Sequence, residues 1–487
     1  MVVSPMGFVV CMAVLLLGYS MGGPVTIGLI ASMAFGSTAL VTLTSLGGSS
    51  PLIYTFFVGL LLLSICCRRR FFSDLGVVFG SMRPIWVLCA IMLSTAVGAW
   101  LFPRIFAGQT TVFVQSKGRI GIIEDALAPV SGNITQTGYF ILGGLTAIAF
   151  SALILNGNKL DLVRRGFFTY CTLVAALGLI DFIGKTAGAG DVLAPIRTAS
   201  YAMLTQAVQA GFARISGAYS EASAFGSSAL ACVALTYIYW RHTGSSYARN
   251  LCGLLLILLV LSTSSTAYVG LAVVSAAIGA SMVFSSLRGR METADVLIMI
   301  AIAAGLLLFL SISLYNEKAF DSIYDLIDAA IFNKSTSVSG QERSYWNVRS
   351  IGAFLDTSGL GVGLGSSSAS SWPVAVLSQL GVLGSVLMVM LVFTVARGLG
   401  GYKAYADPIT VAMVSAVRAG SLSGLVASSL ISGTADPGMF FFISFAVINA
   451  TRARVRLSVL EAKAKDRESR KPVPEPPLGR PGALALA

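Results

Sequence analysis

Charged residues are scarce in this sequence. Only 11% of its 487 residues are Asp, Glu, Lys or Arg, whereas 55% are apolar. Soluble globular proteins carry about a quarter of charged residues, so the composition excludes an ordinary soluble enzyme. The apolar runs instead follow one another along nearly the whole chain, which is typical of an integral membrane protein.

Histidine is almost absent as well. His242 is the only histidine and follows a span on the side expected to be cytoplasmic. No histidine is therefore available for a Ser-His-Asp triad on the outer side, and a zinc site would lack a second histidine. The seven cysteines lie in or beside apolar segments, and none has metal-ligand spacing with a histidine. We read them as small apolar residues rather than as a disulfide framework or a zinc site, and we expect no cofactor.

The apolar runs predict the architecture. A helix needs about 20 apolar residues to cross the hydrocarbon core, and no basic residues precede the first run, so we do not expect a cleavable signal peptide. Candidate spans lie near 7–22, 24–46, 51–67, 84–102, 137–155, 167–184, 222–240, 251–264, 266–284, 297–314, 374–396, 409–431 and 437–450. The sequence therefore predicts an all-α polytopic membrane protein with 12–13 transmembrane helices, in which residues 1–450 form a single transmembrane domain.

The basic residues predict the orientation. By alternation of the spans, 22 of the 33 Lys and Arg residues fall on one side of the membrane, and this bias marks the cytoplasmic side. The bilayer therefore explains most of the net charge of +12, without nucleic acid. The C-terminus is expected inside, and the N-terminus outside if the first two spans are separate. The tail 451–487 begins with alternating charges, as in a surface helix, and ends in a Pro-rich stretch expected to be disordered.

Three outward loops, near 103–136, 185–221 and 315–373, are too long to be simple turns. In the third and largest, residues 319–332 predict a short amphipathic helix whose acidic face either binds a metal or is simply solvated. That acidic face contains Asp321, Asp325 and Asp328.

The same large loop holds two arginines on either side of Trp346. Arg343 and Arg349 are six residues apart, so on a helix they lie on adjacent faces and are able to converge on a bulky anion. The stretch Gly-Leu-Gly-Val-Gly-Leu-Gly at 359–365 follows. It lacks the Gly-Lys-Ser/Thr of a P-loop, and we expect a flexible backbone with free N–H groups.

Two further charged positions stand out. Arg214 and Glu221 are seven residues apart where the second outward loop meets a span, close to the Tyr219 hydroxyl. They either form a structural pair that fixes the loop or contact a substrate. Arg418 lies inside an apolar span, where a charge normally faces a cavity or a partner; snorkelling is the alternative.

In these features the chain resembles the bacterial O-antigen ligase/polymerase family. The segment 214–226 is similar to the family pattern R-x-S-G-x-F-x-E-x-S-x-F/L at the start of a span. A serine-rich outer turn at 261–270 and the large loop with its arginines and glycines follow in the family's order, so the resemblance covers about 210–395. Ligases of the family have a histidine in the large loop, near positions 370–372 here. Its absence favours a polymerase over a ligase.

The resemblance implies an inverting glycosyl transfer at the outer face of the inner membrane of a bacterium, in exopolysaccharide or O-antigen biosynthesis. The donor is an oligosaccharide on a polyprenyl (undecaprenyl) diphosphate, and the acceptor is a sugar hydroxyl of another lipid-linked repeat. A chain-length regulator and a flippase are implied partners. The guanidinium group makes paired hydrogen bonds to phosphate oxygens. We therefore expect Arg214 and Arg343, with Arg349, to hold the diphosphate, and Glu221 either to accept the acceptor's proton or to orient Arg214. Tyr219 and Arg418 are further candidates for substrate contact.

A secondary transporter or a glycan flippase is the alternative, because it shows a similar number of spans and a similar basic side. Carriers gather polar residues near the bilayer midplane, often in two similar halves. In this sequence the polar residues gather in the outward loops, and no half-to-half repeat is evident, which favours the enzyme.

Overall fold

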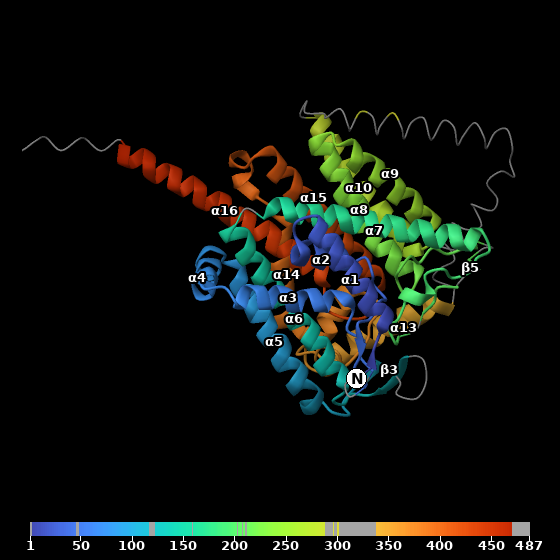
Figure 1. The fold of residues 1–487 in the computed structure, drawn as a ribbon. Helices are drawn as coiled ribbons and strands as arrows, with labels where there is room; N and C mark the ends of the chain where they lie inside the picture. Colours follow the sequence, from blue (N-terminus) through green and yellow to red (C-terminus); the bar gives the residue numbers. More distant parts are fainter. Residues whose placement is uncertain are drawn as a thin grey trace, which may run out of the picture.

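The computed structural model describes residues 2–44, 48–115, 122–157, 159–201, 203–206, 208–209, 212–287, 296, 300 and 338–469. Within these residues the chain is built almost entirely of helices, which confirms the predicted all-α membrane architecture (Figure 1). The helices are α1 (Pro5–Ser20), α2 (Pro24–Ser32), α3 (Ile53–Cys66), α4 (Phe71–Ser81), α5 (Pro84–Ile105), α6 (Ser131–Asn156), α7 (Leu160–Thr186), α8 (Ala222–Thr243), α9 (Ser246–Leu261), α10 (Ser265–Leu287), α13 (Val338–Asp356), α14 (Trp372–Ala396), α15 (Pro408–Ile431) and α16 (Met439–Ser469), with 3-10 turns η2 (Ala194–Ile196) and η5 (Gly400–Tyr405). Short antiparallel pairs join β1 (Val2–Val3) to β2 (Val41–Thr42), β3 (Thr111–Gln115) to β4 (Ile122–Ala126), and β5 (Val208–Gln209) to β6 (Phe212–Ala213).

Seven helices of the described part are long and apolar enough to cross a membrane. They are Pro84–Ile105, Ser131–Asn156, Leu160–Thr186, Ala222–Thr243, Ser265–Phe284, Trp372–Tyr405 and Pro408–Ile431. Four shorter apolar helices, α1, α3, α4 and α9, accompany them. The span expected at 297–314 falls almost wholly outside the described residues, so the total of 12–13 spans stays a prediction.

Helix α8 lies at the centre of the bundle. In its most apolar stretch 78% of the residues are buried, against 33% in α5. It packs against α15 and α9, and small residues allow the close approach: a Cβ on Gly420 of α15 would lie 3.0 Å from the carbonyl oxygen of Ala231 in α8. Small residues at helix contacts are typical of membrane bundles. Of the seven candidate spans α8 is thus the most buried, and Glu221 lies directly before it.

The two ends of the bundle differ. We call the end with β2, the β3–β4 and β5–β6 hairpins and α13 the loop end, and the end with α4 and η5 the basic end; they lie towards the lower right and the upper left of Figure 1. Strand β1 pairs with β2, and the N–H of Ala39 bonds Thr198 Oγ1 at 3.0 Å, so the N-terminus lies at the loop end. The side of the membrane on which this end lies stays a prediction, as does an N-terminus outside.

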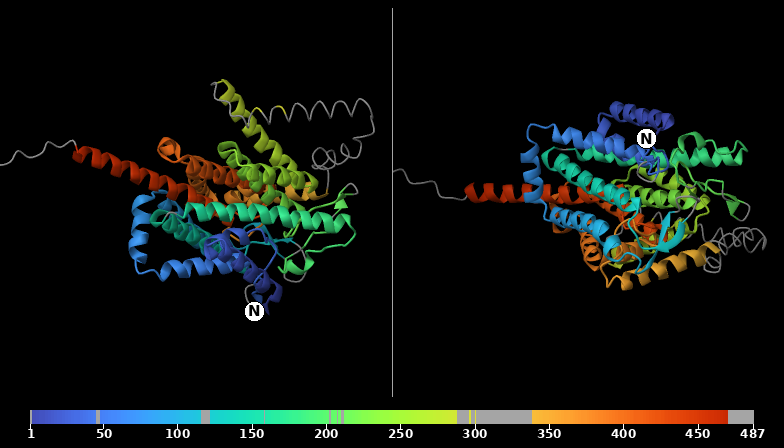
Figure 2. Two further views of the ribbon diagram at one scale, coloured as in Figure 1. Left: turned by 45° about the horizontal axis from the view of Figure 1, so that its top comes forward. Right: turned by 90° about the horizontal axis from the view of Figure 1, so that it is seen from below.

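Helix α16 leaves the bundle at the basic end. It runs without a break from Met439 to Ser469 and projects beyond the other helices (Figures 1 and 2). The span expected at 437–450 and the surface helix expected after residue 451 are therefore one continuous helix over the described part of the tail.

The glycine-rich stretch 359–365 is fixed rather than flexible. The N–H of Val362 bonds the carbonyl oxygen of Ser378 at 2.8 Å, and the N–H of Gly363 bonds that of Gln379 at 3.0 Å. The expectation of free N–H groups is therefore wrong for these two residues. The physical reason is a break in α14 at Gly381 (φ 67°, ψ −168°), which exposes helix carbonyl groups for the stretch to bond.

Gly365→Ala is expected to destabilise the protein more than Gly188→Ala. Both glycines have positive φ, +81° and +72°, and such strain costs about 1–3 kcal/mol for other residues. A Cβ at Gly365 would also lie 2.2 Å from the carbonyl oxygen of Gly132, whereas one at Gly188 meets nothing within 4 Å. Thermal unfolding of the purified proteins measures the difference, and equal losses of Tm would contradict the packing described for 359–365.

Candidate functional site

A buried ion network fastens the loop that precedes α8 to α7. The carboxylate of Asp181 is fully buried and accepts from Lys185 Nζ at 2.9 Å and from Arg197 Nη2 at 3.1 Å. Two backbone N–H groups, of Ser216 and Gly217, donate to the same carboxylate at 2.8 and 3.1 Å. A buried carboxylate needs such partners because its charge is costly to desolvate. Asp181 thereby fixes the backbone two to three residues beyond Arg214.

The two cations of this network bind the loop from the other side. Lys185 Nζ donates to the carbonyl oxygen of Arg214 at 2.7 Å. Arg197 Nε donates to the carbonyl oxygen of Gly217 at 3.0 Å, and Arg197 Nη1 pairs with Asp191. Two carboxylates thus balance two cations, and Arg214 lies on a rigid backbone.

Arg214 belongs to a second group of charges, in which two arginines face one carboxylate. Its side chain is half-buried, and the charges of Glu221 and of Arg343, from α13, both act on it, as does Tyr268 of α10. Burial lowers the pKa of Arg214, Glu221 raises it, and Arg343 lowers it further. Nε of Arg214 is buried and has no hydrogen-bond partner within the described part of the chain. The structure therefore brings the charges of three of the predicted residues within range of one another, from two separate loops of the loop end.

Glu221 and the serine-rich turn lie around the first turn of α8. Glu221 occupies the N-cap position, and its carboxylate accepts from Ser223 Oγ. The turn between α9 and α10 packs here, because a Cβ on Gly226 would lie 3.6 Å from Ser264 Oγ. Thr263 Oγ1 and Ser264 Oγ are buried and make no hydrogen bond to any described residue. The start of α8 therefore borders the hydroxyl of Ser264, which is buried and has no hydrogen-bond partner among the described residues.

Arg343 lies between α13 and the C-terminal end of α15. Its side chain is half-buried, and Nη1 lies 3.5 Å from the carbonyl oxygen of Leu430, which is longer than an ordinary hydrogen bond. It has no ion pair with a described carboxylate. It therefore adds a second guanidinium beside Arg214.

Arg349 has a different partner. It donates to a single oxygen, Oε1, of Glu124 in the β3–β4 hairpin, from Nε at 3.0 Å and from Nη2 at 2.6 Å. Thr111 and Tyr345 also donate to Glu124. The hydrogen bonds lower the pKa of Glu124 to about 2, with the largest effect from Thr111, then Tyr345, then Arg349. Arg349 thus ties α13 to the hairpin and is not brought to Arg214.

Tyr219 and Arg418 also lie apart from the Arg214 group. Tyr219 is buried, its hydroxyl donates to the carbonyl oxygen of Met33 at 3.3 Å, and its ring packs on Gly36, so packing accounts for it. Arg418 is exposed and its Nη1 lies 3.4 Å from the carbonyl oxygen of Ala396, at the C-terminal end of α14 near the basic end. This position agrees with snorkelling, which was the alternative for Arg418.

The acidic helix expected at 319–332, with Asp321, Asp325 and Asp328, lies outside the described residues, and its metal hypothesis stays a prediction. Among the described residues no group of three or more His, Cys, Asp or Glu is placed to hold a metal ion.

The structure adds two features that the sequence reasoning missed. The first is Asp181 with Lys185, whose only signal is an acid four residues before a base inside an apolar run, an expensive arrangement in a membrane unless paired. The second is Asp436, in the turn between α15 and α16 at the loop end, which accepts from the N–H of Gly438 at 2.8 Å. Burial raises the pKa of Asp436 to about 6.

The Asp436 carboxyl predicts a pH dependence of stability. Because its folded pKa of about 6 exceeds the unfolded value of about 3.9, the folded state binds more protons between these values. The free energy of unfolding is therefore expected to fall as the pH rises from about 4 through about 6. Asp436→Asn should weaken this dependence, which thermal unfolding at several pH values measures. An unchanged pH dependence in the variant would contradict the assignment.

No protein-family model matches the chain, and no curated protein matches its sequence significantly. The resemblance to the O-antigen ligase/polymerase family therefore depends on the residues themselves.

Proposed function

We propose that the protein is a polysaccharide polymerase similar to the O-antigen ligase/polymerase family. In this proposal it extends a glycan by inverting transfer from polyprenyl diphosphate to a sugar hydroxyl of a second lipid-linked repeat. The proposed setting is the outer face of a bacterial inner membrane, with the loop end outside and the C-terminus in the cytoplasm. A flippase would supply the repeats, and a chain-length regulator would limit the product.

The observation that carries the proposal is the pairing of Arg214 with Arg343. They come from different loops, and the charges of Arg343 and of Glu221 both act on Arg214, so one described carboxylate faces two guanidinium groups and the group keeps a net positive charge. Like charges are brought together at a cost, which an anion between them would offset. A diphosphate is a suitable anion, since each guanidinium offers paired N–H donors to phosphate oxygens.

The chemistry follows from this placement. The acceptor hydroxyl attacks the anomeric carbon from the face opposite the diphosphate, the bond from that carbon to the phosphate oxygen breaks, and the charge that develops on the leaving group is stabilised by Arg214 and Arg343. Glu221 either accepts the proton of the hydroxyl or orients Arg214. The buried network around Asp181 holds the loop so that the cations are preorganised.

A secondary transporter or glycan flippase is less well supported. Carriers place charged residues near the bilayer midplane. Among the described residues, Arg418 reaches towards the basic end, and the network of Asp181 and Arg197 lies at the loop end with the second outward loop. This distribution supports an enzyme that works at one membrane surface.

The lipid-linked intermediates of a deletion strain test the function. Loss of a polymerase is expected to leave single repeats on the polyprenyl carrier and no long glycan, and the wild-type gene should restore the long glycan. Full-length glycan in the deletion strain would contradict the proposal, and a loss of solute uptake without this accumulation would favour the carrier.

A further inference from the structure

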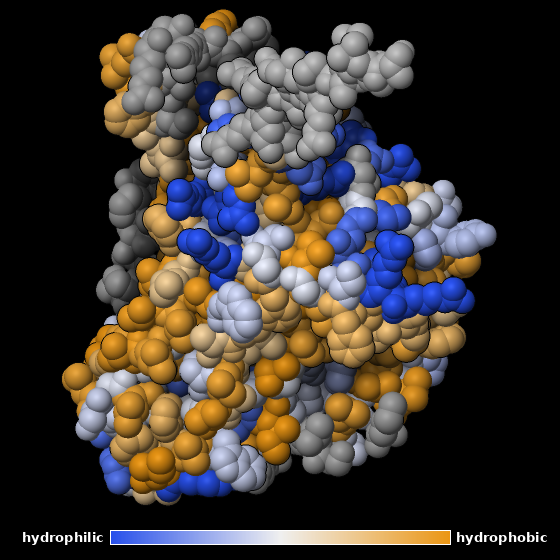
Figure 3. Space-filling model, turned by 90° about the vertical axis from the view of Figure 1, so that its left-hand side faces the viewer, coloured by the Kyte–Doolittle hydropathy of each residue, from blue (hydrophilic) through white to orange (hydrophobic). Residues whose placement is uncertain are grey.

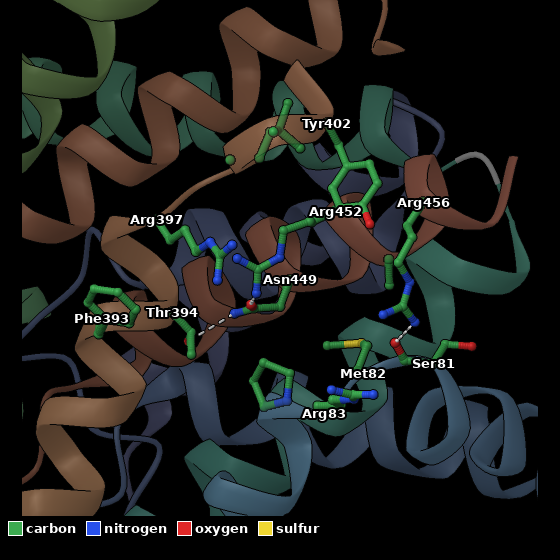
Figure 4. A pocket seen from close by; sticks show the side chains of 15 residues that line it. Ser81, Met82, Arg83, Phe393, Thr394, Arg397, Tyr402, Asn449, Arg452 and Arg456 are labelled. Carbon is green, nitrogen blue, oxygen red and sulfur yellow. Dashed lines mark hydrogen bonds between the residues drawn. The ribbon is translucent and has the colours of Figure 1, made fainter. Parts of the chain in front are cut away.

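A second group of arginines lines a cavity at the basic end. The cavity has a volume of about 320 Å³ and lies between the start of α5, the end of α14, η5 and α16. Four of its lining residues are Arg83, Arg397, Arg452 and Arg456. In Figure 4, Arg397 and Arg452 lie side by side, Arg83 approaches from α5, and Arg456 lies further along α16. Figure 3 views this end of the molecule, where hydrophilic residues gather in a band across the upper middle and hydrophobic residues cover most of the surface below them.

The arginines of this cavity fall into two pairs. Arg452 and Arg456 are half-buried and held by the protein: Arg452 Nη2 donates to Asn449 Oδ1 at 2.6 Å, and Arg456 Nη2 donates to the carbonyl oxygen of Ser81 at 2.7 Å. Arg83 and Arg397 are exposed, and their guanidinium groups make no hydrogen bond or ion pair with any described residue. Two of the four guanidinium groups are thus held by the protein, and the other two are available to a ligand.

The charges of these arginines have no carboxylate beside them in the described lining of the cavity. Among the described residues that line the cavity, none is Asp or Glu. The positive charges of Arg397 and Arg456 both act on Arg452. Like charges repel one another, and the repulsion is stronger in a partly desolvated site than in water. A bound anion would relieve the repulsion, and guanidinium groups favour phosphate because its oxygens accept their paired donors.

The surface beside the cavity distinguishes a phosphate that belongs to a lipid headgroup from a free phosphate ion. Phe393 lines the cavity and is 63% exposed, and three further exposed apolar residues precede it on the same face of α14. These are Val386, Val389 and Met390. An apolar helix face that leads from a membrane span to a basic cavity suits acyl chains attached to an anionic headgroup, whereas a free phosphate would need no such face.

We propose that this cavity binds the phosphate group of an anionic membrane phospholipid, with the acyl chains along the Val386–Phe393 face of α14. The site is separate from the Arg214 group and does not depend on the proposed polymerase activity. Basic pockets between transmembrane helices are a general form of anionic lipid site.

Lipid binding to the purified full-length protein tests this proposal. The affinity for phosphatidylglycerol and for phosphatidylcholine is measured by native mass spectrometry for the wild type and for the double variant Arg83→Gln/Arg397→Gln. We expect phosphatidylglycerol to bind more tightly than phosphatidylcholine, and the double variant to lose about 30-fold in affinity for it. Because both arginines are exposed, Tm should be unchanged.

The matched control is Arg69→Gln/Arg70→Gln, which removes two exposed charges from the same end outside the cavity. It should keep the wild-type affinity, and an equal loss in this variant would overturn the proposal in favour of general surface attraction. Equal binding of the two lipids would also overturn it. A further arm adds inorganic phosphate at millimolar concentration: displacement of phosphatidylglycerol by it would assign the cavity to a soluble phosphate and overturn the lipid assignment, whereas no displacement supports the lipid.

Discussion

Arg214→Ala and Arg343→Ala are each expected to reduce glycan extension by about 100- to 1,000-fold, the usual cost of removing one preorganised donor from a developing anion. Each variant removes a guanidinium that no described ion pair holds in place, so the fold should tolerate the change. Arg214→Lys keeps the charge but not the paired donors, and it is expected to fall between the wild type and alanine. Rates are measured with lipid-linked oligosaccharide and purified protein of confirmed Tm.

Arg104→Ala is the matched control for these two variants. Arg104 lies at the end of α5 on the loop end, and its guanidinium stacks 3.9 Å from the ring centroid of Trp100. The variant removes one positive charge from the same end without touching the Arg214 group, and it should retain the wild-type rate. Normal extension by Arg214→Ala and Arg343→Ala would refute their role in holding the diphosphate, and an equal loss in Arg104→Ala would reduce that role to the general charge of the surface.

Asp181→Asn has the largest effect that we expect on stability. The variant keeps the shape of the side chain but leaves Lys185 and Arg197 with less opposing charge in a buried site. Breaking a buried pair by removing one partner costs about 3–5 kcal/mol. The loop from 212 to 221 should also exchange amide hydrogens faster, because two of its N–H groups bond this carboxylate. Unfolding of the purified protein and hydrogen exchange measure the two effects.

Asp161→Asn, at the other end of α7, is the control for Asp181. Asp161 pairs with Arg164 and Arg165 on the surface, with a side chain that is 48% exposed. Exposed pairs contribute about 0–1 kcal/mol, so this variant should lose little stability and leave the loop unchanged. If the two variants are equally stable, Asp181 does not anchor the loop.

Much of the architecture could be predicted from the sequence because it depends on local properties. Apolar runs of sufficient length predicted the helices, and the position of Arg214 and Glu221 before a span predicted that both would lie near the start of α8. The order of the loops also brought Arg343 to the same end. Each of these predictions depended on the length of an apolar run or on the order of runs and loops, and both can be read from the sequence directly.

The remaining features depend on contacts between distant residues. Asp181 and Arg197 are 16 residues apart, and only the fold shows that a carboxylate within a span has a partner in the following loop. Arg349 was expected beside Arg343, but Glu124, 225 residues away, binds it instead. The arginines of the basic cavity come from α5, α14 and α16, so no local pattern joins them.

Glycan extension by the purified protein in liposomes tests the central claim most directly. The liposomes contain one kind of polyprenyl diphosphate-linked repeat and no other enzyme. We predict glycans of two or more repeats, free polyprenyl diphosphate released in proportion to the new bonds, and loss of both products with Arg214→Ala. If well-folded wild-type protein leaves the single repeats unchanged while a known polymerase extends them under the same conditions, the account is contradicted.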